Sequence, residues 1–404
     1  MSEVFRSALE GPKQNAKPWP PSTRDKTSRM KPATLNKTQI ERLEKIGQHL
    51  IDQGRAKVIV PPQANASGFW FGGGNMAVDD TGVLWLIGRY RNHGDSRTGL
   101  NAGERGLELA VFRSDDKGDS FQKVLSIPKS KLNVGDREVL SIEGAAIRFG
   151  DFGVEVFVST EKSSIGYPES LASYLKPGTG VWTIDRLQSD QVETLNTSKP
   201  ETLLETSDPR YIHIKDPFLA EHQGMPAILF CSHPFCWTSS NTGLIPIKDG
   251  ALDMEKLSFD FFPRGVTWDV AMSRGTAVLP LPQKGVLRSQ PVSLFFYDGG
   301  ECVRNLEEHE SAIKRPRGYS CEELGGLAFC TDGDLSHPTR ISELAPAFVS
   351  PHGTGCSRYV DVLDDDEYYY ATWQQSQADF SQPLVLNRVS KESVIEILEA
   401  ESQS

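Results

Sequence analysis

Residues 142–158 read IEGAAIRFGDFGVEVFV, and this stretch shows a plan that the rest of the chain repeats. A charged residue, Glu143, opens a run of small and apolar residues, and a Gly-Asp turn follows at residues 150–151. A second run rich in β-branched and aromatic residues begins at Val154. Short runs of this kind between Gly and Asp turns are typical of β-strands. The stretch therefore predicts two strands joined by a turn, the first beginning with a carboxylate.

The same plan recurs five times between residues 75 and 390, each time with two or three further β-rich runs after the first. The opening residues are Asn75, Glu143, Asp216, Asp269 and Arg358. Five such units predict an all-β fold, a five-bladed β-propeller whose blades surround a central channel. The fifth unit has only three runs, and we expect residues 56–62, AKVIVPP, to supply its outer strand. A β-sandwich is the competing fold, but the repetition of whole units favours the propeller.

The two ends of the chain differ from the repeats. Residues 1–35 are poor in apolar side chains and predict an extended arm. A helix should follow up to Gly54, with Thr38 as its cap, because apolar residues recur at helical spacing. We expect this helix to pack on the propeller, or else to join the arm in forming a homodimer. The predicted parts are an arm and helix (1–55), a propeller (56–392) and an acidic tail (393–404).

Composition narrows the partners. With 43 Lys and Arg against 54 Asp and Glu, the net charge is −11, which argues against nucleic acid and anionic membranes as partners. The first residues lack the basic and apolar segments of an export signal, so we expect a cytoplasmic protein whose six cysteines stay reduced. No two cysteines have the CxxC spacing of a zinc site, and we expect no metal.

The five opening residues are the first candidates for chemistry. In a propeller the first strand of each blade lines the channel, so a polar residue at its start points into the mouth. A charge there is costly unless it is paired or functional. The alternative is that some of these residues only tie turns together, as Asp and Asn often do. Asp361, three residues after Arg358, belongs to the same group.

Three stretches resemble the five-bladed propeller glycosidases, a superfamily that includes arabinanases, xylosidases and invertases. Residues 142–158 look like their acid motif, in which Glu-Gly opens an inner strand. KDPFLAEHQGMPAILF (215–230) is similar to their Asp-Pro blade opening, and SLFFYDGG (293–300) with LGGLAFCTDGDL (324–335) resembles a late blade. The resemblance implies hydrolysis of a small oligosaccharide by inner-strand carboxylates, without a cofactor.

The resemblance also implies roles for single residues. Glu143 would be the general acid, and Asp216 a pKa modulator or the base. The family's first-blade Asp falls at Asn75, which cannot act as a base, so Asp269 is the expected replacement. Glycoside cleavage needs one protonated carboxyl group for the leaving oxygen and one ionised carboxylate that activates water or attacks the sugar.

Arginine and polar residues near the predicted mouth are candidates for substrate binding. An acidic protein with many loop arginines favours a substrate with a carboxylate or sulfate, which Arg binds through two hydrogen bonds; the alternative is that they pair with surface acids. The candidates are Asn75, Arg91, His93, Arg274, Arg317, Tyr319, Glu323 and Arg358.

Two other functions stay open at this point. One is a lyase for uronic-acid glycosides, with His93 or Tyr319 as base and Arg317 neutralising the uronate. The other is a propeller that binds carbohydrate without catalysis, whose inner-strand acids would be dispersed or ion-paired.

A further resemblance is local. Residues 114–121, SDDKGDSF, fit the Asp-box of sialidases and related repeats, S-x-D-x-G-x-S-F. The motif implies a tight hairpin on the outer edge of a blade and supports the propeller rather than any one activity.

Overall fold

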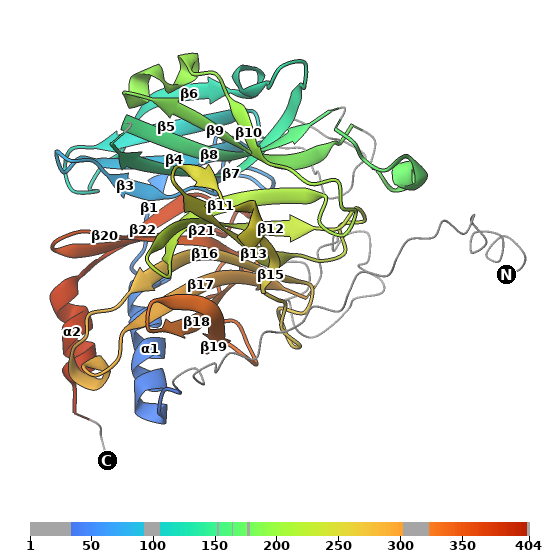
Figure 1. Ribbon diagram of the computed structural model, residues 1–404. Helices are drawn as coiled ribbons and strands as arrows, with labels where there is room; N and C mark the ends of the chain where they lie inside the picture. The colour runs from blue at the N-terminus through green and yellow to red at the C-terminus, as the bar shows by residue number, and fades with distance from the viewer. Residues whose placement is uncertain are drawn as a thin grey trace, which may run out of the picture. The chain divides into compact units, whose positions relative to one another are not determined.

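The computed structural model describes residues 34–92, 106–151, 153–163, 165–175, 178–301 and 323–401. The predicted all-β fold with five blades is confirmed, since these residues form five separate antiparallel sheets of four or five strands (Figure 1). The first two blades contain β2 (Trp70–Gly72), β3 (Met76–Val78), β4 (Leu84–Arg91), β5 (Glu108–Ser114) and β6 (Gln122–Pro128), then β7 (Val139–Gly150), β8 (Gly153–Lys162), β9 (Val181–Ser189) and β10 (Glu201–Leu204).

Blade 3 contains an additional strand within a stretch that the sequence pattern left irregular. The three later blades are formed by β11 (His213–His222), β12 (Met225–His233), β13 (Asn241–Lys248), β14 (Ala251–Leu252) and β15 (Ser258–Phe262), then β16 (Met272–Pro280), β17 (Val292–Gly300), β18 (Leu324–Thr331) and β19 (Asp334–Arg340), then β20 (Ser357–Asp364), β21 (Tyr368–Gln375), β22 (Leu384–Ser390) and β1 (Lys57–Val60). Short 3-10 helices join some of them: η3 (Lys129–Leu132), η4 (Glu169–Tyr174), η5 (Val192–Thr197), η6 (Met254–Lys256) and η7 (Gly285–Leu287).

The blades are held together by apolar side chains between neighbouring sheets. Separate buried clusters lie between blades 1 and 2, 2 and 3, 3 and 4, 4 and 5, and 5 and 1. The inner strands contact one another in the order β3, β7, β11, β16 and β20, and β20 contacts β3 again. Face-to-face packing of sheets on both sides of every blade explains why most of these strands are apolar on both faces.

The ring closes as the sequence predicted. β1, which precedes the first full blade, pairs antiparallel with β22, and Lys57 lies opposite Leu386. A strand from one end of the chain thereby completes the sheet built from the other end. The hydrophobic residue Val60 joins Leu384 in the core between blades 5 and 1.

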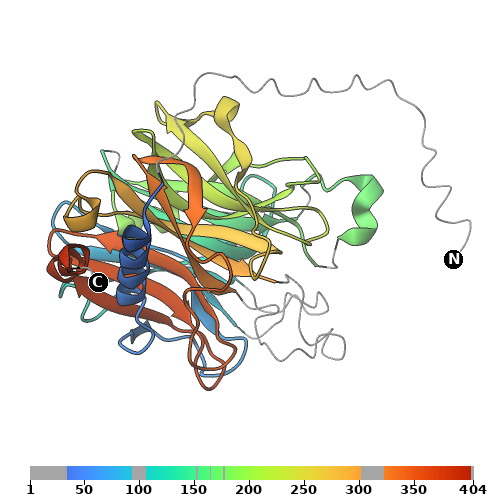
Figure 2. The same ribbon diagram turned by 90° about the horizontal axis from the view of Figure 1, so that it is seen from below.

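Two helices cover one side of blades 4 and 5 and lie next to each other (Figures 1 and 2). The first is α1 (Lys37–Leu50), which Asn36 rather than Thr38 caps, with Gln39 completing a capping box. Its apolar residues Leu43 and Ile46 are buried against the propeller, as one of the two expectations had it. Dimerisation through the arm stays a prediction, because residues 1–33 lie outside the described part of the chain.

The predicted acidic tail is mostly helical. α2 (Lys391–Glu399) begins at the capping residue Ser390 and buries Val394 and Leu398 in the same core as α1. The acidic residues stand on its exposed side, which is why composition alone gave no sign of the helix. Among the described residues, no helix is long and apolar enough to cross a membrane.

The sequence SDDKGDSF forms the turn between β5 and β6, the two outer strands of blade 1. Asp116 accepts hydrogen bonds from the Ser114 hydroxyl at 2.8 Å and the Ser120 amide at 2.9 Å. Lys117 and Gly118 both adopt positive φ, which lets the chain reverse within a few residues.

The seam between blades 5 and 1 contains a carboxyl group with an altered titration. Asp361 on β20 is partly buried and accepts a hydrogen bond from the Met76 amide of β3 at 2.8 Å. Burial raises the pKa of Asp361 to about 7. The folded chain therefore holds this proton more tightly than the unfolded chain does, so this group's contribution to stability falls as the pH rises from about 4 to about 7.

Replacing Asp361 by asparagine should remove that loss. We expect Asp361→Asn to gain stability relative to the unchanged protein between about pH 5 and about pH 8, because only the unchanged protein must ionise a buried group there. Urea unfolding at both pH values measures the difference, with the exposed Asp115→Asn as control. Parallel pH profiles for the unchanged protein and Asp361→Asn would contradict the account.

Candidate functional site

A pocket lies where the inner strands of all five blades meet. It has a volume of about 330 Å³ counted out to its open mouth. Its lining comes from every blade and includes Asn75, Gly144, Asp216, Arg274 and Tyr359.

β-Bulges shape this pocket. The register shifts between Ile142 and Ala145 in β7, between Lys215 and Phe218 in β11, and between Arg358 and Asp361 in β20, and a further shift follows Gly275 in β16. A bulge re-aims the side chains beside it. The extra residues at the three larger shifts include Glu143, Asp216 and Tyr359, and the latter two have φ of 54° and 53°. Positive φ is strained for residues with a side chain and is concentrated at functional sites.

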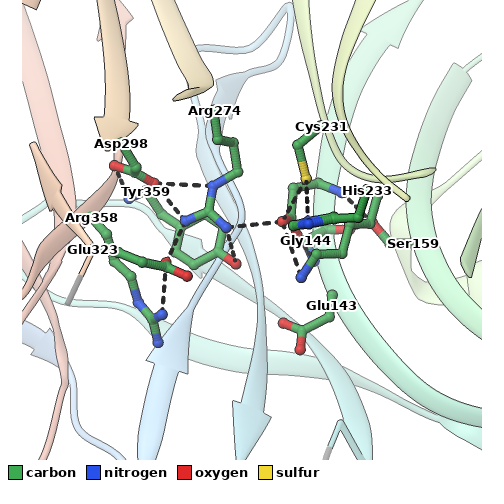
Figure 3. A network of polar contacts seen from close by, with 12 residues as sticks. Glu143, Gly144, Ser159, Cys231, His233, Arg274, Asp298, Glu323, Arg358 and Tyr359 are labelled. Atoms are coloured by element: carbon green, nitrogen blue, oxygen red, sulfur yellow. Dashed lines mark hydrogen bonds and ion pairs between the residues drawn. The ribbon is translucent and has the colours of Figure 1, made fainter. Parts of the chain in front are cut away.

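Arg274 is the centre of the charged cluster around the pocket (Figure 3). Its Nε and Nη2 donate to Asp298 Oδ2 at 3.1 and 2.6 Å, and Nη2 also donates to Glu323 Oε2 at 2.6 Å. Its Nη1 donates to Asp216 Oδ2 at 3.0 Å and to the Tyr359 hydroxyl at 3.1 Å. A guanidinium has five N–H groups, and all five are used. Arg274 therefore organises the site and has no N–H left for the substrate contact that its sequence position suggested.

Glu143 lies between two buried arginines of β4. Arg89 Nε and Nη2 donate to its Oε2 at 2.9 and 2.5 Å, and Arg91 Nη1 donates to its Oε1 at 2.5 Å. Burial on its own would raise the pKa of Glu143, but Arg89, Arg91 and the nearby Lys215 hold that pKa well below its usual range. Glu143 is therefore ionised in this state of the protein.

Asp216 joins blades 2 and 3. Its Oδ1 accepts a hydrogen bond from the Gly144 amide at 2.9 Å, and its own amide donates to Ser159 Oγ at 2.6 Å. The thiol of Cys231 donates to Oδ2 at 3.4 Å. Burial opposes ionisation of Asp216, yet Lys215 and Arg274 lower its pKa.

Glu323 is the most exposed acid of the cluster, with 26% of its side chain accessible. Its Oε2 accepts from both Arg274 and Arg358, the latter at 2.7 Å. These two arginines outweigh burial and lower the pKa of Glu323 far below its usual range. Arg358 also lies over the ring of Trp70 at 4.5 Å, as Arg91 does at 5.0 Å.

Asn75 serves as a link between blades rather than a free ligand. Its amide nitrogen donates to the Ile147 carbonyl at 3.0 Å, and its amide oxygen accepts from the Ile147 amide at 2.8 Å. Both groups of one side chain thus pair with both backbone groups of one residue on β7. A carboxylate could accept but not donate, which gives a physical reason for asparagine at this position.

Asn75→Asp should therefore destabilise the protein. The Ile147 carbonyl would lose its donor and face a negative charge, and we expect a loss of about 1–3 kcal/mol in the free energy of unfolding. Chemical unfolding near neutral pH measures this, with Asn92→Asp, at an exposed hydrogen bond, as control. Unchanged stability in Asn75→Asp would show that the link between blades is not needed.

Asp269 does not open an inner strand, so the predicted position was wrong. β16 begins at Met272, and Asp269 precedes it as a fully buried residue. Its Oδ2 accepts from Arg340 Nε on the outer strand β19 at 2.7 Å and from Ser273 at 3.3 Å. Asp269 thereby fastens blade 4 internally, and the polar residue that this blade contributes to the cluster is Arg274.

The predicted residues thus fall into three groups. The structure brings Glu143, Asp216, Arg91, Arg274, Glu323 and Arg358 together, and it gives Asn75 and Asp269 linking positions. His93, Arg317 and Tyr319 lie outside the described residues. The sequence analysis missed Arg89, Lys215, Asp298 and Tyr359. Lys215 and Tyr359 are sequence neighbours of predicted residues, whereas Arg89 and Asp298 stand on second strands, where an apolar run hides a charge.

Within the described ranges, no three His, Cys, Asp or Glu residues are grouped so that they could hold a metal ion. The acids of the site have arginine partners instead.

Comparisons with known proteins place the fold. No family model matches the sequence, and no curated protein matches it. A solved structure described as a glycoside hydrolase aligns over 88% of this chain and 96% of its own, with a TM-score of 0.56 and 9% sequence identity. A structure of BT0996 in complex with RGII aligns over 87% of this chain and 96% of its own, with a TM-score of 0.52 and 10% identity. The chain therefore has the fold of these proteins, as the predicted resemblance to propeller glycosidases implied.

Proposed function

We propose that the chain is a glycoside hydrolase that acts on a small, acidic oligosaccharide at the channel mouth. The supporting observation is that Glu143, Asp216 and Glu323 come from three different parts of the chain and converge on one cluster (Figure 3). Lys215 acts electrostatically on all three, which places them within one small region.

In this proposal Glu323 is the ionised carboxylate of the reaction. Its Oε2 is fixed by Arg274 and Arg358, while its Oε1 accepts no hydrogen bond from the rest of the described chain. A carboxylate that is oriented on one oxygen and open on the other can attack the sugar carbon or remove a proton from water.

Glu143 is the proposed proton donor, and the electrostatics set a condition on that role. A general acid must be protonated, and the arginine pair keeps Glu143 ionised in the free protein. An anionic substrate supplies the missing step, because its negative charge next to the cluster draws on the same cations and raises the pKa of Glu143. An acidic sugar would thus prepare its own acid catalyst, whereas a neutral one would not.

The lyase alternative has one observation in its favour and one against it. Arg274 Nη1 lies 3.1 Å from the Tyr359 hydroxyl, where it could stabilise a phenolate. Burial, however, raises the pKa of Tyr359 further above its usual value, and Arg274 does not offset this. Tyr359 is therefore poorly suited as a base, and hydrolysis remains the proposal.

A panel of aryl glycosides tests the proposed activity. Each sugar is offered in two forms, the neutral glycoside and the corresponding uronide, and release of the aryl group is followed. We expect cleavage of at least one uronide. Formation of an unsaturated uronate without uptake of water would instead show a lyase. Binding of uronides with no cleavage of any member would favour a carbohydrate-binding propeller and contradict the proposal.

A further inference from the structure

We propose that Lys215 receives the carboxylate of the substrate's acidic sugar, in a subsite between Trp182 and Trp237. This inference rests on the proposed function and names the group that would select the substrate. It follows from three properties of the described chain: the hydrogen bonds that the cations of the cluster already make, the aromatic side chains around Lys215, and the charge state of its neighbours.

The arginines of the cluster already have carboxylate partners. Arg274 uses all five of its N–H groups, Arg89 is committed to Glu143, and Arg358 donates to Glu323. Lys215 differs from them. Its Nζ lies 3.6 Å from Asp216 Oδ2, beyond hydrogen-bond distance, and it has no closer polar partner among the described residues. An ammonium group has three N–H donors, so Lys215 retains donors for a ligand.

Asp216 does not depend on Lys215 for its hydrogen bonds. It already accepts from the Gly144 amide, the Arg274 guanidinium and the Cys231 thiol. The Lys215 side chain is 13% exposed, which leaves its end within reach of a ligand in the mouth. The ammonium can therefore turn to a second carboxylate while Asp216 keeps its other partners.

The side chains around Lys215 suit a sugar ring. Its Nζ lies 5.6 Å from the centre of the Trp182 ring and 5.7 Å from that of Trp237. Trp237 is only partly buried and has φ of 54°, a strained conformation that is typical of functional positions. It rests on His213, with ring centres 4.2 Å apart, so its orientation is fixed before a ligand binds.

The two histidines beside Trp237 are neutral at physiological pH. Burial, and then the charge of Lys215, lower the pKa of His213 to about 3 and hold that of His233 well below its usual value. Both ring nitrogens of the fully buried His213 lack a hydrogen-bond partner among the described residues. Lys215 is thus the positive charge of this corner, and neutral imidazoles next to it offer polar contacts without repelling a sugar.

The subsite would also explain how Glu143 becomes an acid. Lys215 is one of the three cations that hold Glu143 ionised. A substrate carboxylate paired with Lys215 would cancel that positive charge, and the pKa of Glu143 would rise. Recognition of the acidic group and activation of the proton donor would then occur in the same binding event.

Direct binding to the full chain tests the inference without relying on turnover. The probes are glucuronic acid with glucose and galacturonic acid with galactose, and each pair differs only in the carboxylate. Tryptophan fluorescence and calorimetry report binding. We expect the acid of at least one pair to bind about tenfold or more tightly than its neutral partner, since a hydrogen bond between charged groups contributes that much. Lys215→Met should lose this preference, and Lys215→Arg should keep part of it.

Two controls separate the possible failures. Lys117→Met removes a lysine on the outer turn of blade 1 and should leave the preference unchanged. If Lys215→Met does not fold, the methyl ester of the preferred uronic acid is tested on the unchanged protein and should bind as weakly as the neutral sugar. Equal binding of acid and ester, or a preference that persists in Lys215→Met, would overturn the inference. Uronate binding without cleavage of any glycoside would instead refute only the proposed hydrolysis.

Discussion

Arg274→Met should lower the free energy of unfolding by about 3–5 kcal/mol, the loss typical when one partner of a buried ion pair is removed. Arg274 is 1% exposed and binds Asp216, Asp298 and Glu323 at once. Methionine fills a similar volume but leaves three buried carboxylates without their shared cation. These must then take up protons or draw water into the core, and either change disrupts the pocket. Activity should be lost together with stability.

Urea unfolding of Arg274→Met measures this effect, and two further variants define its cause. Arg210→Met removes an arginine whose partner Asp208 stands on the surface, and its unfolding should hardly change. Arg274→Lys keeps the charge but not the planar five-donor geometry, so it should fall between the two. If Arg274→Met unfolded like the unchanged protein, Arg274 would not be the centre of the site.

Glu143→Gln should reduce kcat/KM by about 100-fold or more, the usual effect of losing a general acid. Glutamine keeps the shape of the side chain but cannot transfer a proton. It also leaves Arg89 and Arg91 without a charged partner, so some loss of stability is expected beside the loss of activity. Steady-state kinetics on the substrate found in the glycoside panel measures the first effect, and urea unfolding measures the second.

Blade 2 contains a matched control for this variant. Glu155 on β8 is also buried, at 8% exposure against 6% for Glu143, and it too lies between two arginines, Arg148 and Arg186. It is absent from the lining of the channel pocket. Glu155→Gln should therefore lose stability to a similar degree and keep its activity. A Glu143→Gln variant no less active than Glu155→Gln would remove Glu143 from the mechanism.

Much of the fold could be predicted because its signal is local. The sequence of each blade opening, such as Glu143 before GAAIRFG, contains the apolar strand and the polar residue that faces the channel in a short stretch. The pairing of β1 with β22 could also be predicted, since the last blade lacked one strand. The α2 helix could not, because its few apolar residues act only through contacts with α1 and blade 4 that lie far away in the sequence.

The site could be predicted in part, for a related reason. Sequence pattern places a charge at a strand end but does not tell which opposite charge it meets. Asp269 has the same local pattern as Asp216, yet its partner Arg340 lies on an outer strand and Asp216 meets Arg274 at the channel. The acid function of Glu143 depends likewise on Arg89, which stands 54 residues earlier in the chain. Bulges add to the difficulty, since a shift of one residue reverses the direction of a side chain.

A crystal structure of Glu143→Gln with its bound uronide would test the central claim most directly, because it locates the sugar in the protein. The account predicts the scissile bond between residue 143 and Glu323 at the channel mouth, with the sugar carboxylate on Lys215 and a ring face against Trp237. A uronide bound away from the channel mouth, with neither Glu323 nor Lys215 in contact with it, would contradict the account.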